Sequence, residues 1–301
     1  MKHRSTASLL FCLLLLSACD DSSGAKQKYS FVNISTCASH ACAIDINTFA
    51  ITCFGNCESS GACDVPPIPV KSFSVGDFST CLIRQDDSSI LCVGGMAAFT
   101  PPTGTFNQIA TADDNFACAL RSDNTLACWG DEYEGRTQPP AGTFYGLDCG
   151  PFHCCAIATD TRTVSCWGSN DYGQSSPPSG EFMAVTVGQA TTCGLRMTEY
   201  ATGTATCWGS DFQGIDLAPS GYWAELSMGS GGGCVFDRGS MGHLDCWGYP
   251  DIATIPDDID ISQISAIDVG GGTAGTSVCV VNGPGTVQCW GSGTRYWEIP
   301  R

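Results

Sequence analysis

The amino-acid sequence predicts an all-β protein, a seven-bladed β-propeller with about one disulfide per blade. Three observations lead to this prediction. The chain of 301 residues is rich in glycine and poor in charge, with 36 glycines and only 14% charged side chains. It contains 21 cysteines. Most of these cysteines recur in pairs at intervals near 40 residues, and such a period indicates a repeat architecture.

The first residues have the composition of an export signal. The basic segment Lys2–Arg4 precedes an apolar run, Leu9–Leu16, that is too short for a membrane-spanning helix but typical of a secretory signal peptide. The run continues into Leu16-Ser17-Ala18-Cys19, which resembles the lipobox of bacterial lipoproteins. This resemblance implies that residues 1–18 are a signal peptide and that Cys19 receives the lipid.

The signal, the polar residues after it and the repeat together predict the organisation of the whole chain. We expect residues 19–29 to form a lipidated, flexible tether and residues 30–301 to form the propeller. Because several acyl chains on one residue give stable anchoring, the lipid alone would hold the protein at the membrane. The alternative is an ordinary secretory signal with cleavage nearby. The predicted location is a bacterial cell envelope, on a membrane surface facing the periplasm or the cell exterior.

Charge and cysteine content restrict the compartment and the partners. The formal net charge is −17, so the surface repels nucleic-acid phosphates and anionic lipid headgroups. We therefore exclude nucleic acid as the main partner. A large number of cysteines suits an oxidising compartment, where disulfides persist. We expect a monomer.

The paired cysteines define a repeating hairpin. Seven segments share the form Cys, 9 to 13 residues, Cys, an aromatic or apolar residue, and Gly; five of them end in Cys-Trp-Gly. Within each segment two short apolar runs flank a polar turn, the pattern of a β-hairpin, and opposed residues of a hairpin are close enough for a disulfide. The predicted pairs are Cys42 with Cys53, Cys81 with Cys92, Cys118 with Cys128, Cys155 with Cys166, Cys193 with Cys207, Cys234 with Cys246, and Cys279 with Cys289.

Beyond the signal peptide, which contains Cys12, five cysteines remain in addition to the hairpins and the lipid site. Two short-range disulfides are predicted among them: Cys57 with Cys63, and Cys149 with Cys154. Cys37, which stands where other repeats have Gly, is then left as the odd thiol. Because Cys154 and Cys155 are adjacent, either could pair with Cys166, and the sequence leaves this choice open.

The number of copies indicates how the repeats are arranged. Seven copies of a repeat near 40 residues with several short strands are typical of a propeller in which each blade is a four-stranded sheet. A solenoid is the competing geometry, but solenoids generally end in atypical capping repeats. Here the first and last repeats are nearly full members, which favours a closed ring.

The repeat also resembles a known family. The Cys-Ala-Leu and Cys-Trp-Gly elements, followed in one repeat by Asn170–Gln174 (Asn-Asp-Tyr-Gly-Gln), resemble the repeat of the regulator of chromosome condensation. The paired cysteines make the chain most similar to the disulfide-bearing version in ectodomains of plant crinkly-type receptor kinases and in bacterial surface lipoproteins. The resemblance implies a seven-bladed propeller but no single activity, since this fold supports nucleotide exchange, enzyme inhibition, receptor ectodomains and lyases.

Little in the sequence indicates catalysis. The three histidines beyond the signal are His40, His153 and His243, and the first two occupy similar repeat positions, which favours structural hydrogen bonding over catalysis. No nucleophile elbow, zinc-protease motif or phosphate loop is present. Cys-His clusters could suggest zinc, but disulfides are favoured in an oxidising compartment. We expect no catalytic residues, no metal and no cofactor.

The loops after each Trp-Gly carry acids and aromatic residues. In a propeller these loops would gather on one rim, which could bind a basic protein surface, a sugar by stacking, or a cation. The alternative is that each aromatic caps its own blade. The possible rim residues are Asp131, Glu132, Tyr133, Asp171, Tyr172, Asp211, Phe212, Tyr249, Tyr296 and Trp297. Insertions at Met197–Gly203 and Arg238–His243 also point to a binding face.

These features predict a lipid-anchored, non-enzymatic binding module for another protein or a glycan. One alternative is a propeller enzyme, a lyase or hydrolase, whose site in the central channel would bring together His153, His243 and acidic side chains. The other is a purely structural envelope protein. The sequence does not identify the ligand.

Overall fold

The described part of the chain is the repeat region. The computed structural model describes residues 31–294 except residues 38, 58–59, 112–114, 199–201, 212–213, 215, 238–241, 273–274 and 284. The predicted signal peptide (residues 1–18), the lipid site Cys19 and the tether (residues 19–29) lie outside these residues. They stay predictions.

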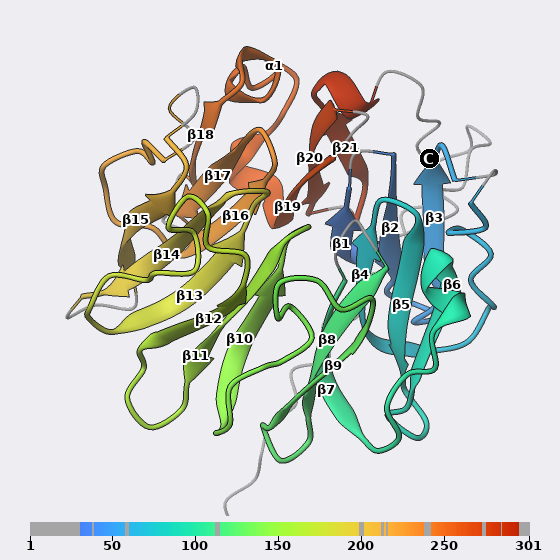
Figure 1. Cartoon of the computed structure of the whole chain (residues 1–301). Helices are drawn as coiled ribbons and strands as arrows, with labels where there is room; N and C mark the ends of the chain where they lie inside the picture. The colour runs from blue at the N-terminus through green and yellow to red at the C-terminus, as the bar shows by residue number, and fades with distance from the viewer. Residues whose placement is uncertain are drawn as a thin grey trace, which may run out of the picture.

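Seven antiparallel sheets of three strands each follow one another around a ring (Figure 1), so the predicted seven-bladed propeller is confirmed. The strands are, in blade 1, β1 (Phe31–Thr36), β2 (His40–Asp45) and β3 (Ile51–Gly55); in blade 2, β4 (Val70–Gly76), β5 (Ser79–Arg84) and β6 (Ile90–Gly94); in blade 3, β7 (Phe106–Thr111), β8 (Phe116–Arg121) and β9 (Leu126–Gly130); in blade 4, β10 (Phe144–Cys149), β11 (His153–Ala158) and β12 (Val164–Gly168); in blade 5, β13 (Phe182–Val187), β14 (Thr191–Met197) and β15 (Gly203–Gly209); in blade 6, β16 (Glu225–Gly229), β17 (Gly232–Asp237) and β18 (His243–Gly248); in blade 7, β19 (Ile264–Gly272), β20 (Gly275–Asn282) and β21 (Val287–Trp290).

Helices are few and short in the described residues. They are η1 (Gly95–Ala98), α1 (Pro250–Ala253), η3 (Ile261–Gln263) and η4 (Ser292–Thr294). In this part of the chain, no helix has the length and apolar character needed to cross a membrane.

The expectation of four strands per blade is wrong, because each described sheet has three. After the Gly that ends the third strand, the chain leaves the sheet and forms a loop that runs into a Pro-Pro segment in several repeats. Proline has no N–H to donate to a sheet. Instead, tryptophans of the next blade hold some of these loops: the indole of Trp167 donates to the Arg136 carbonyl at 3.0 Å, and that of Trp208 to the Gln174 carbonyl at 2.9 Å.

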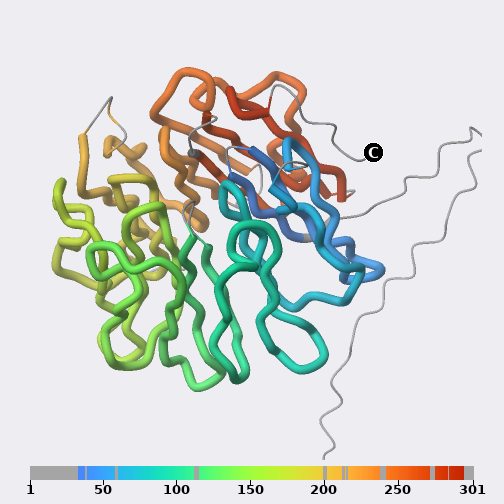
Figure 2. Tube along the Cα trace, turned by 45° about the vertical axis from the view of Figure 1, so that its right-hand side comes forward, coloured from blue at the N-terminus to red at the C-terminus, as the bar shows by residue number. Residues whose placement is uncertain are grey.

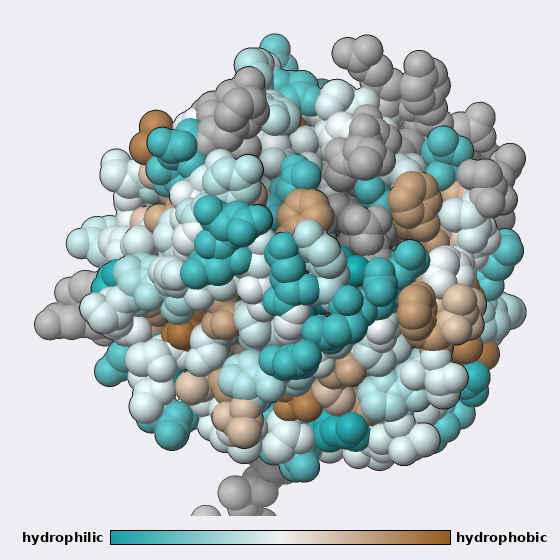
Figure 3. Space-filling model, viewed as in Figure 1, coloured by the Kyte–Doolittle hydropathy of each residue, from teal (hydrophilic) through white to brown (hydrophobic). Residues whose placement is uncertain are grey.

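Apolar side chains are buried mainly between the blades. Seven clusters of buried side chains are present, and each joins two neighbouring blades. The cluster that includes Ile34, Phe54 and Val281 joins blade 1 to blade 7. Hydrophilic residues gather across the middle of the face seen in Figure 3, while hydrophobic ones are scattered there. The ring therefore has seven equivalent interfaces in place of one central core.

All nine predicted disulfides are present. The seven hairpin pairs join directly opposed residues of the second and third strands, as Cys118 and Cys128 show with a Cα–Cα distance of 4.0 Å. The choice left open by the sequence is resolved, because Cys155 bonds to Cys166 and Cys154 to Cys149. Cys37 is the free cysteine among the described residues.

The innermost strand of each blade is linked to the next by side-chain hydrogen bonds, which we call the closure belt. In six blades the residue two positions before the repeated Gly, or before Cys37 in blade 1, accepts a hydrogen bond from a backbone N–H of the following blade. The pairs are Ser35 with Val75 (3.1 Å), Ser74 with Thr111 (3.0 Å), Asp148 with Val187 (2.7 Å), Thr186 with Met228 (3.1 Å), Ser227 with Val269 (2.9 Å) and Asp268 with Thr36 (2.7 Å). Blade 3 has Ala110 at this position and makes no such bond.

Glycines two residues after the belt residue allow the inner strands of neighbouring blades to approach closely. A Cβ on Gly188 would lie 2.6 Å from the Gly229 carbonyl oxygen, and a Cβ on Gly229 would lie 2.6 Å from that of Gly270. The repeated Gly ahead of the first cysteine is therefore required by contact between blades. Cys37 takes this position in blade 1, where a Cβ on Gly270 would lie 2.5 Å from the Cys37 Cα atom.

In the part of the chain that the structure describes, blades 1 and 7 meet without sharing a strand. Figure 2 shows the blue and red segments side by side, and β1 packs against β19 and β20. Asp268 accepts the Thr36 N–H, and the Ser277 hydroxyl donates to the Cys37 carbonyl at 2.7 Å. Side-chain hydrogen bonds and one apolar cluster thus replace the shared strand that could have fastened the ring.

We predict that Asp268→Asn changes the pH dependence of stability. Burial raises the pKa of Asp268 to about 7, from 3.8 in a free carboxyl. Between pH 4 and pH 7 the folded protein holds a proton that the unfolded chain has released, so stability falls as pH rises. Since Asn does not ionise, the free energy of unfolding of the variant relative to wild type should increase by roughly 2 to 4 kcal/mol from pH 4 to pH 8.

Chemical denaturation at several pH values measures this difference. The comparison with wild type is needed because burial lowers the pKa of His40 to about 4 and that of His153 to about 3, and neutral histidines add stability as pH rises. Asp160→Asn, at an exposed turn, is the matched control and should leave the difference flat. Parallel curves for Asp268→Asn and wild type would contradict the prediction.

Candidate functional site

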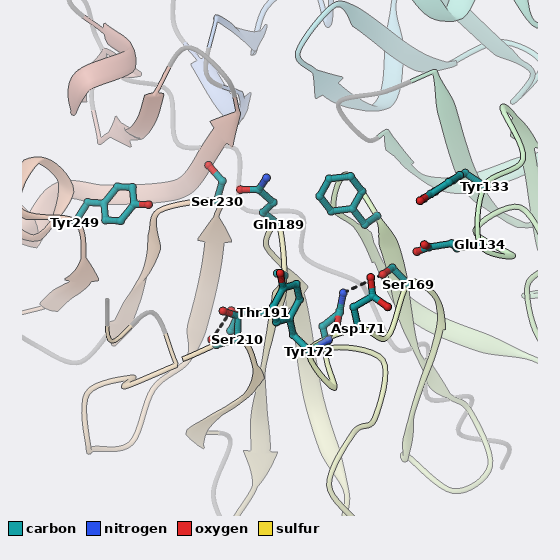
Figure 4. A pocket seen from close by; sticks show the side chains of 13 residues that line it. Tyr133, Glu134, Ser169, Asp171, Tyr172, Gln189, Thr191, Ser210, Ser230 and Tyr249 are labelled. Atoms are coloured by element: carbon teal, nitrogen blue, oxygen red, sulfur yellow. Dashed lines mark hydrogen bonds between the residues drawn. The ribbon is translucent and has the colours of Figure 1, made fainter. Parts of the chain in front are cut away.

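A pocket of about 520 Å³ lies on one face of the propeller and is lined by residues from blades 3 to 6 (Figure 4). Two sets of segments form it. The turns between the first and second strands supply Phe152, Gln189 and Ser230, and the segments after the third strands supply Tyr172 and Tyr249, among others. In an antiparallel hairpin blade these two sets come to the same end of the sheet, so the topology itself brings them together.

The loop after blade 4 forms the floor and one wall of the pocket. Buried Gln174 fixes it, because its side-chain oxygen accepts the Tyr172 N–H at 2.8 Å and its amide donates to Ser169. The Asn170 side chain accepts the Ser175 N–H at 3.0 Å. This loop presents Asp171 and Tyr172 to the pocket while its own backbone groups are bonded internally. Such a loop is preorganised for binding.

The loop after blade 3 lines the neighbouring part of the pocket (Figure 4) and rests on Arg136. This side chain is only 4% exposed. Its guanidinium lies 4.6 Å from the Phe116 ring centroid and 5.9 Å from that of Tyr133, and it donates to the Pro151 carbonyl at 3.2 Å. Arg136 therefore ties this loop to the first turn of blade 4 and supports Tyr133 from within the protein.

The structure brings together part of the predicted rim. Tyr133, Asp171, Tyr172 and Tyr249 line the pocket. Three predicted acids do not line it: Asp131 pairs with Arg136 at 3.4 Å, Glu132 accepts the Gln138 amide at 3.1 Å, and Asp211 lies outside the lining. Phe212, Tyr296 and Trp297 are outside the described residues.

Burial decides between a binding and a capping role for these aromatic residues. Tyr133 is 55% exposed and Tyr172 is 64% exposed, so neither caps a blade. Tyr249 does pack on two of the apolar clusters between blades, as the capping alternative expects, although it also reaches the pocket. The two exposed rings are therefore the ones available to a ligand.

Sequence reasoning missed several lining residues. Phe152, Gln189 and Ser230 follow the repeated glycines by one or two positions, so an alignment of the repeats at these glycines could have found them. The expected role of the insertions is not supported by the pocket. Their described residues, including Thr198 and Gly242, lie in the turns between second and third strands, at the other end of the blades.

The central channel holds a smaller cavity, of about 100 Å³, lined by the inner strands and by Asp148, Asp268 and Cys37. No described histidine lines it. His40 bonds Thr80 of the next blade at 3.1 Å, His153 bonds Thr192 at 2.6 Å, and His243 packs against Trp223 with ring centroids 5.2 Å apart. The histidine and acid cluster that a channel enzyme would need does not form in the described residues.

Sulfur atoms of Cys118, Cys149 and Cys154 lie close together, within the range of a metal-ligand group. All three belong to disulfides, Cys118 with Cys128 and Cys149 with Cys154. Metal binding by cysteine requires the thiolate, so this cluster supports the disulfide interpretation of the sequence.

We predict that Cys37 is inert in the native protein. It is 2% exposed, its sulfur lies 3.3 Å from His40 Nδ1, and burial raises the pKa of its thiol to about 12, with the Asp77 charge as a second cause. Because the thiolate is the reactive form, iodoacetamide should not label the native protein but should label one thiol after unfolding without reductant. Mass spectrometry measures the added groups, and Cys37→Ser should take up none; fast labelling of the native wild type would oppose the prediction.

Comparison with known proteins identifies the repeat. The family described as regulator of chromosome condensation (RCC1) repeat matches residues 146–174, which include five pocket-lining positions of blade 4 and its loop. No curated protein matches the chain.

Solved structures with the same fold include plant receptor ectodomains. The ectodomain of the receptor kinase CR4 from Physcomitrella patens is 23% identical with a TM-score of 0.70, covering 86% of this chain and 73% of that one. The CRINKLY WD40 ectodomain of the Arabidopsis thaliana receptor kinase ACR4 is 20% identical with a TM-score of 0.70, covering 88% and 96%. Prp20p from Saccharomyces cerevisiae is 12% identical with a TM-score of 0.62, covering 86% and 81%.

The fold and the pocket define a disulfide-rich β-propeller with a candidate binding site on one face. At these sequence identities the solved structures show a shared fold. The chain carries an RCC1 repeat on a propeller similar to the crinkly receptor ectodomains, as the sequence resemblance implied. Its nine disulfides indicate an oxidising, extracytoplasmic compartment.

Proposed function

We propose that this protein is a lipid-anchored, non-enzymatic binding module of a bacterial cell envelope, and that it holds a partner protein at the pocket on blades 3 to 6. The observation that carries the proposal is the pocket itself, in which segments of four consecutive blades expose two tyrosine rings beside preorganised polar groups. Solvent-exposed aromatic rings in a fixed frame are typical of binding surfaces.

Two further observations support this function. Propellers of this fold include receptor ectodomains, and Prp20p was characterised for its binding properties to Gsp1p and histones, so the fold is used to hold proteins. The predicted lipobox at Cys19 would place the module at a membrane surface, where a stable anchor keeps it near envelope partners. A glycan is the competing ligand, because tyrosine faces also stack on sugars.

Labelling with a palmitate analogue tests the anchor. We expect the wild-type protein, made in a bacterial host with the lipoprotein pathway, to carry the label and to remain with membranes. Cys19→Ser should carry none and should be released, because the sulfur that takes the diacylglycerol is gone. Cys37→Ser is the matched control, because it makes the same substitution at another cysteine that is in no disulfide, and it should label normally. Equal label on wild type and Cys19→Ser would reject the lipid anchor.

Cross-linking on native envelopes tests the binding function. We expect Tyr172→Ala to reduce the affinity for a specific partner, and with it the capture, by roughly thirtyfold, since an aromatic anchor that becomes buried in a protein interface contributes about 2 kcal/mol. Tyr222→Ala is the matched control, because Tyr222 is 63% exposed but does not line the pocket. Quantitative mass spectrometry measures the captured partner.

Three outcomes of this experiment have different meanings. Equal capture by wild type and Tyr172→Ala would contradict a role for the pocket. Capture that survives protease treatment of the partner but is lost after glycosidase treatment would favour the glycan. Recovery of no specific partner by the wild-type protein would favour a purely structural role in the envelope.

A further inference from the structure

One half of the pocket is acidic and the other half is uncharged. Its charged lining residues are Glu134 and Asp171, both acidic, and no Lys, Arg or His lines it in the described part of the chain. Glu134 belongs to the loop after blade 3 and Asp171 to the loop after blade 4, so the two carboxylates face the same space from different walls (Figure 4). The whole chain has a formal net charge of −17, which adds to the negative potential.

Two exposed tyrosine rings lie beside these carboxylates. Tyr133 precedes Glu134 and Tyr172 follows Asp171, so each wall presents one ring and one acid. The electron-rich face of an aromatic ring attracts a cation, and a nearby carboxylate adds to this attraction. The Tyr133 ring already lies 5.9 Å from the guanidinium of Arg136. This contact shows that the ring is compatible with a basic side chain.

The two carboxylates also affect the pKa of Tyr133. Its pKa is raised, first by a hydrogen bond to Glu134 and by the charge of Glu134, and further by the charge of Asp171. Arg136 acts in the opposite direction but is the smaller effect. Arg136 is also buried and engaged with Asp131 and with the Pro151 carbonyl, so it does not neutralise the pocket.

The other half of the pocket is polar without charge. Gln189, Ser230 and Tyr249 lie there, away from Tyr133 and Glu134 (Figure 4). Amide and hydroxyl groups of this kind can both donate and accept hydrogen bonds, which suits the backbone of a peptide. A volume of about 520 Å³ is within the range of roughly 300 to 1,000 Å³ typical of small-ligand sites, and is larger than one side chain needs.

We propose that the pocket takes a lysine or arginine side chain of the partner protein, with its cationic head between Tyr133 and Tyr172 and against the carboxylates of Asp171 and Glu134. The peptide on either side of this residue lies over Gln189 and Ser230. The inference rests on the proposed binding function and narrows it to a partner with an exposed basic residue.

Binding of a defined probe tests the charge preference. The probe is a fluorescent peptide, Gly-Ser-Lys-Ser-Gly, with its acetyl-lysine form as the neutral control, added to the complete mature protein in detergent. Fluorescence anisotropy should show binding of the lysine peptide that is at least about threefold tighter than that of the acetylated one. Raising the salt concentration should weaken only the lysine peptide, because exposed charges are screened.

Variants locate the interaction. Asp171→Asn keeps the shape and removes one charge, and Tyr172→Ala removes one ring; each should weaken the lysine peptide roughly three- to tenfold. Asp160→Asn and Tyr222→Ala are the matched controls away from the pocket and should leave its affinity unchanged. Far-ultraviolet circular dichroism checks that all four variants fold.

The outcomes separate this inference from the proposed function. Equal binding of the lysine and acetyl-lysine peptides, or an unchanged affinity in Asp171→Asn, would overturn the proposal that the pocket takes a basic side chain. If capture from native envelopes still depends on Tyr172 in that case, the binding function stands and only the inference fails. Stronger binding of glucosamine or a neutral disaccharide than of the lysine peptide would also overturn it, in favour of a sugar. Loss of both peptide binding and capture would remove both proposals.

Discussion

The closure belt is the constraint on which the rest of this structure depends. In six of the seven blades the inner strand presents a side-chain oxygen to a backbone N–H of the next blade, and the last such bond, from Thr36 to Asp268, joins the two ends of the ring. A repeat array gains stability from its neighbour interfaces, and a ring gains one interface more than a linear array of equal length. Among the described residues no strand is shared between blades 1 and 7, so this bond, the Ser277 bond to the Cys37 carbonyl and the apolar cluster beside them hold the two ends together.

Closure at the centre leaves the face of the ring free for function. The glycines beside the belt bring the inner strands so close that the channel retains a cavity of only about 100 Å³. The larger space, about 520 Å³, lies where loops of neighbouring blades meet. Side chains of the central strands are therefore engaged in holding the blades together, while the loops after each Trp-Gly are available for recognition. The disulfides reinforce this division, since each hairpin bridge fastens the outer strands and leaves these loops free to differ.

The spacing of the cysteines predicted the fold well, because equivalent contacts in the blades require the same residue types at the same intervals. Paired cysteines recur in all seven blades because each blade has the same hairpin. The Gly ahead of them and Cys-Trp-Gly recur in most blades, where the same close approach and the same contact with a neighbour are made. The fourth strand was predicted wrongly because the period alone does not distinguish a strand from a loop held by a tryptophan. The closure belt was not predicted, because Ser, Thr and Asp alternate at its position and Ala110 interrupts it.

The site was harder to predict than the fold for a related reason. A loop residue acts through its neighbours on other blades, and its own sequence does not show which of them it will face. Asp131 follows Trp-Gly directly and Asp171 lies two positions further along its loop; Asp131 pairs with Arg136 of its own loop, while Asp171 faces the pocket. The difference comes from the repeat position seven residues after Trp, which is Arg136 in one loop and Gln174 in the other. The charged Arg136 pairs with the acid of its own loop, whereas the neutral, buried Gln174 holds only the backbone of its loop. One loop therefore uses its acid for its own structure, and the other leaves its acid free for a ligand.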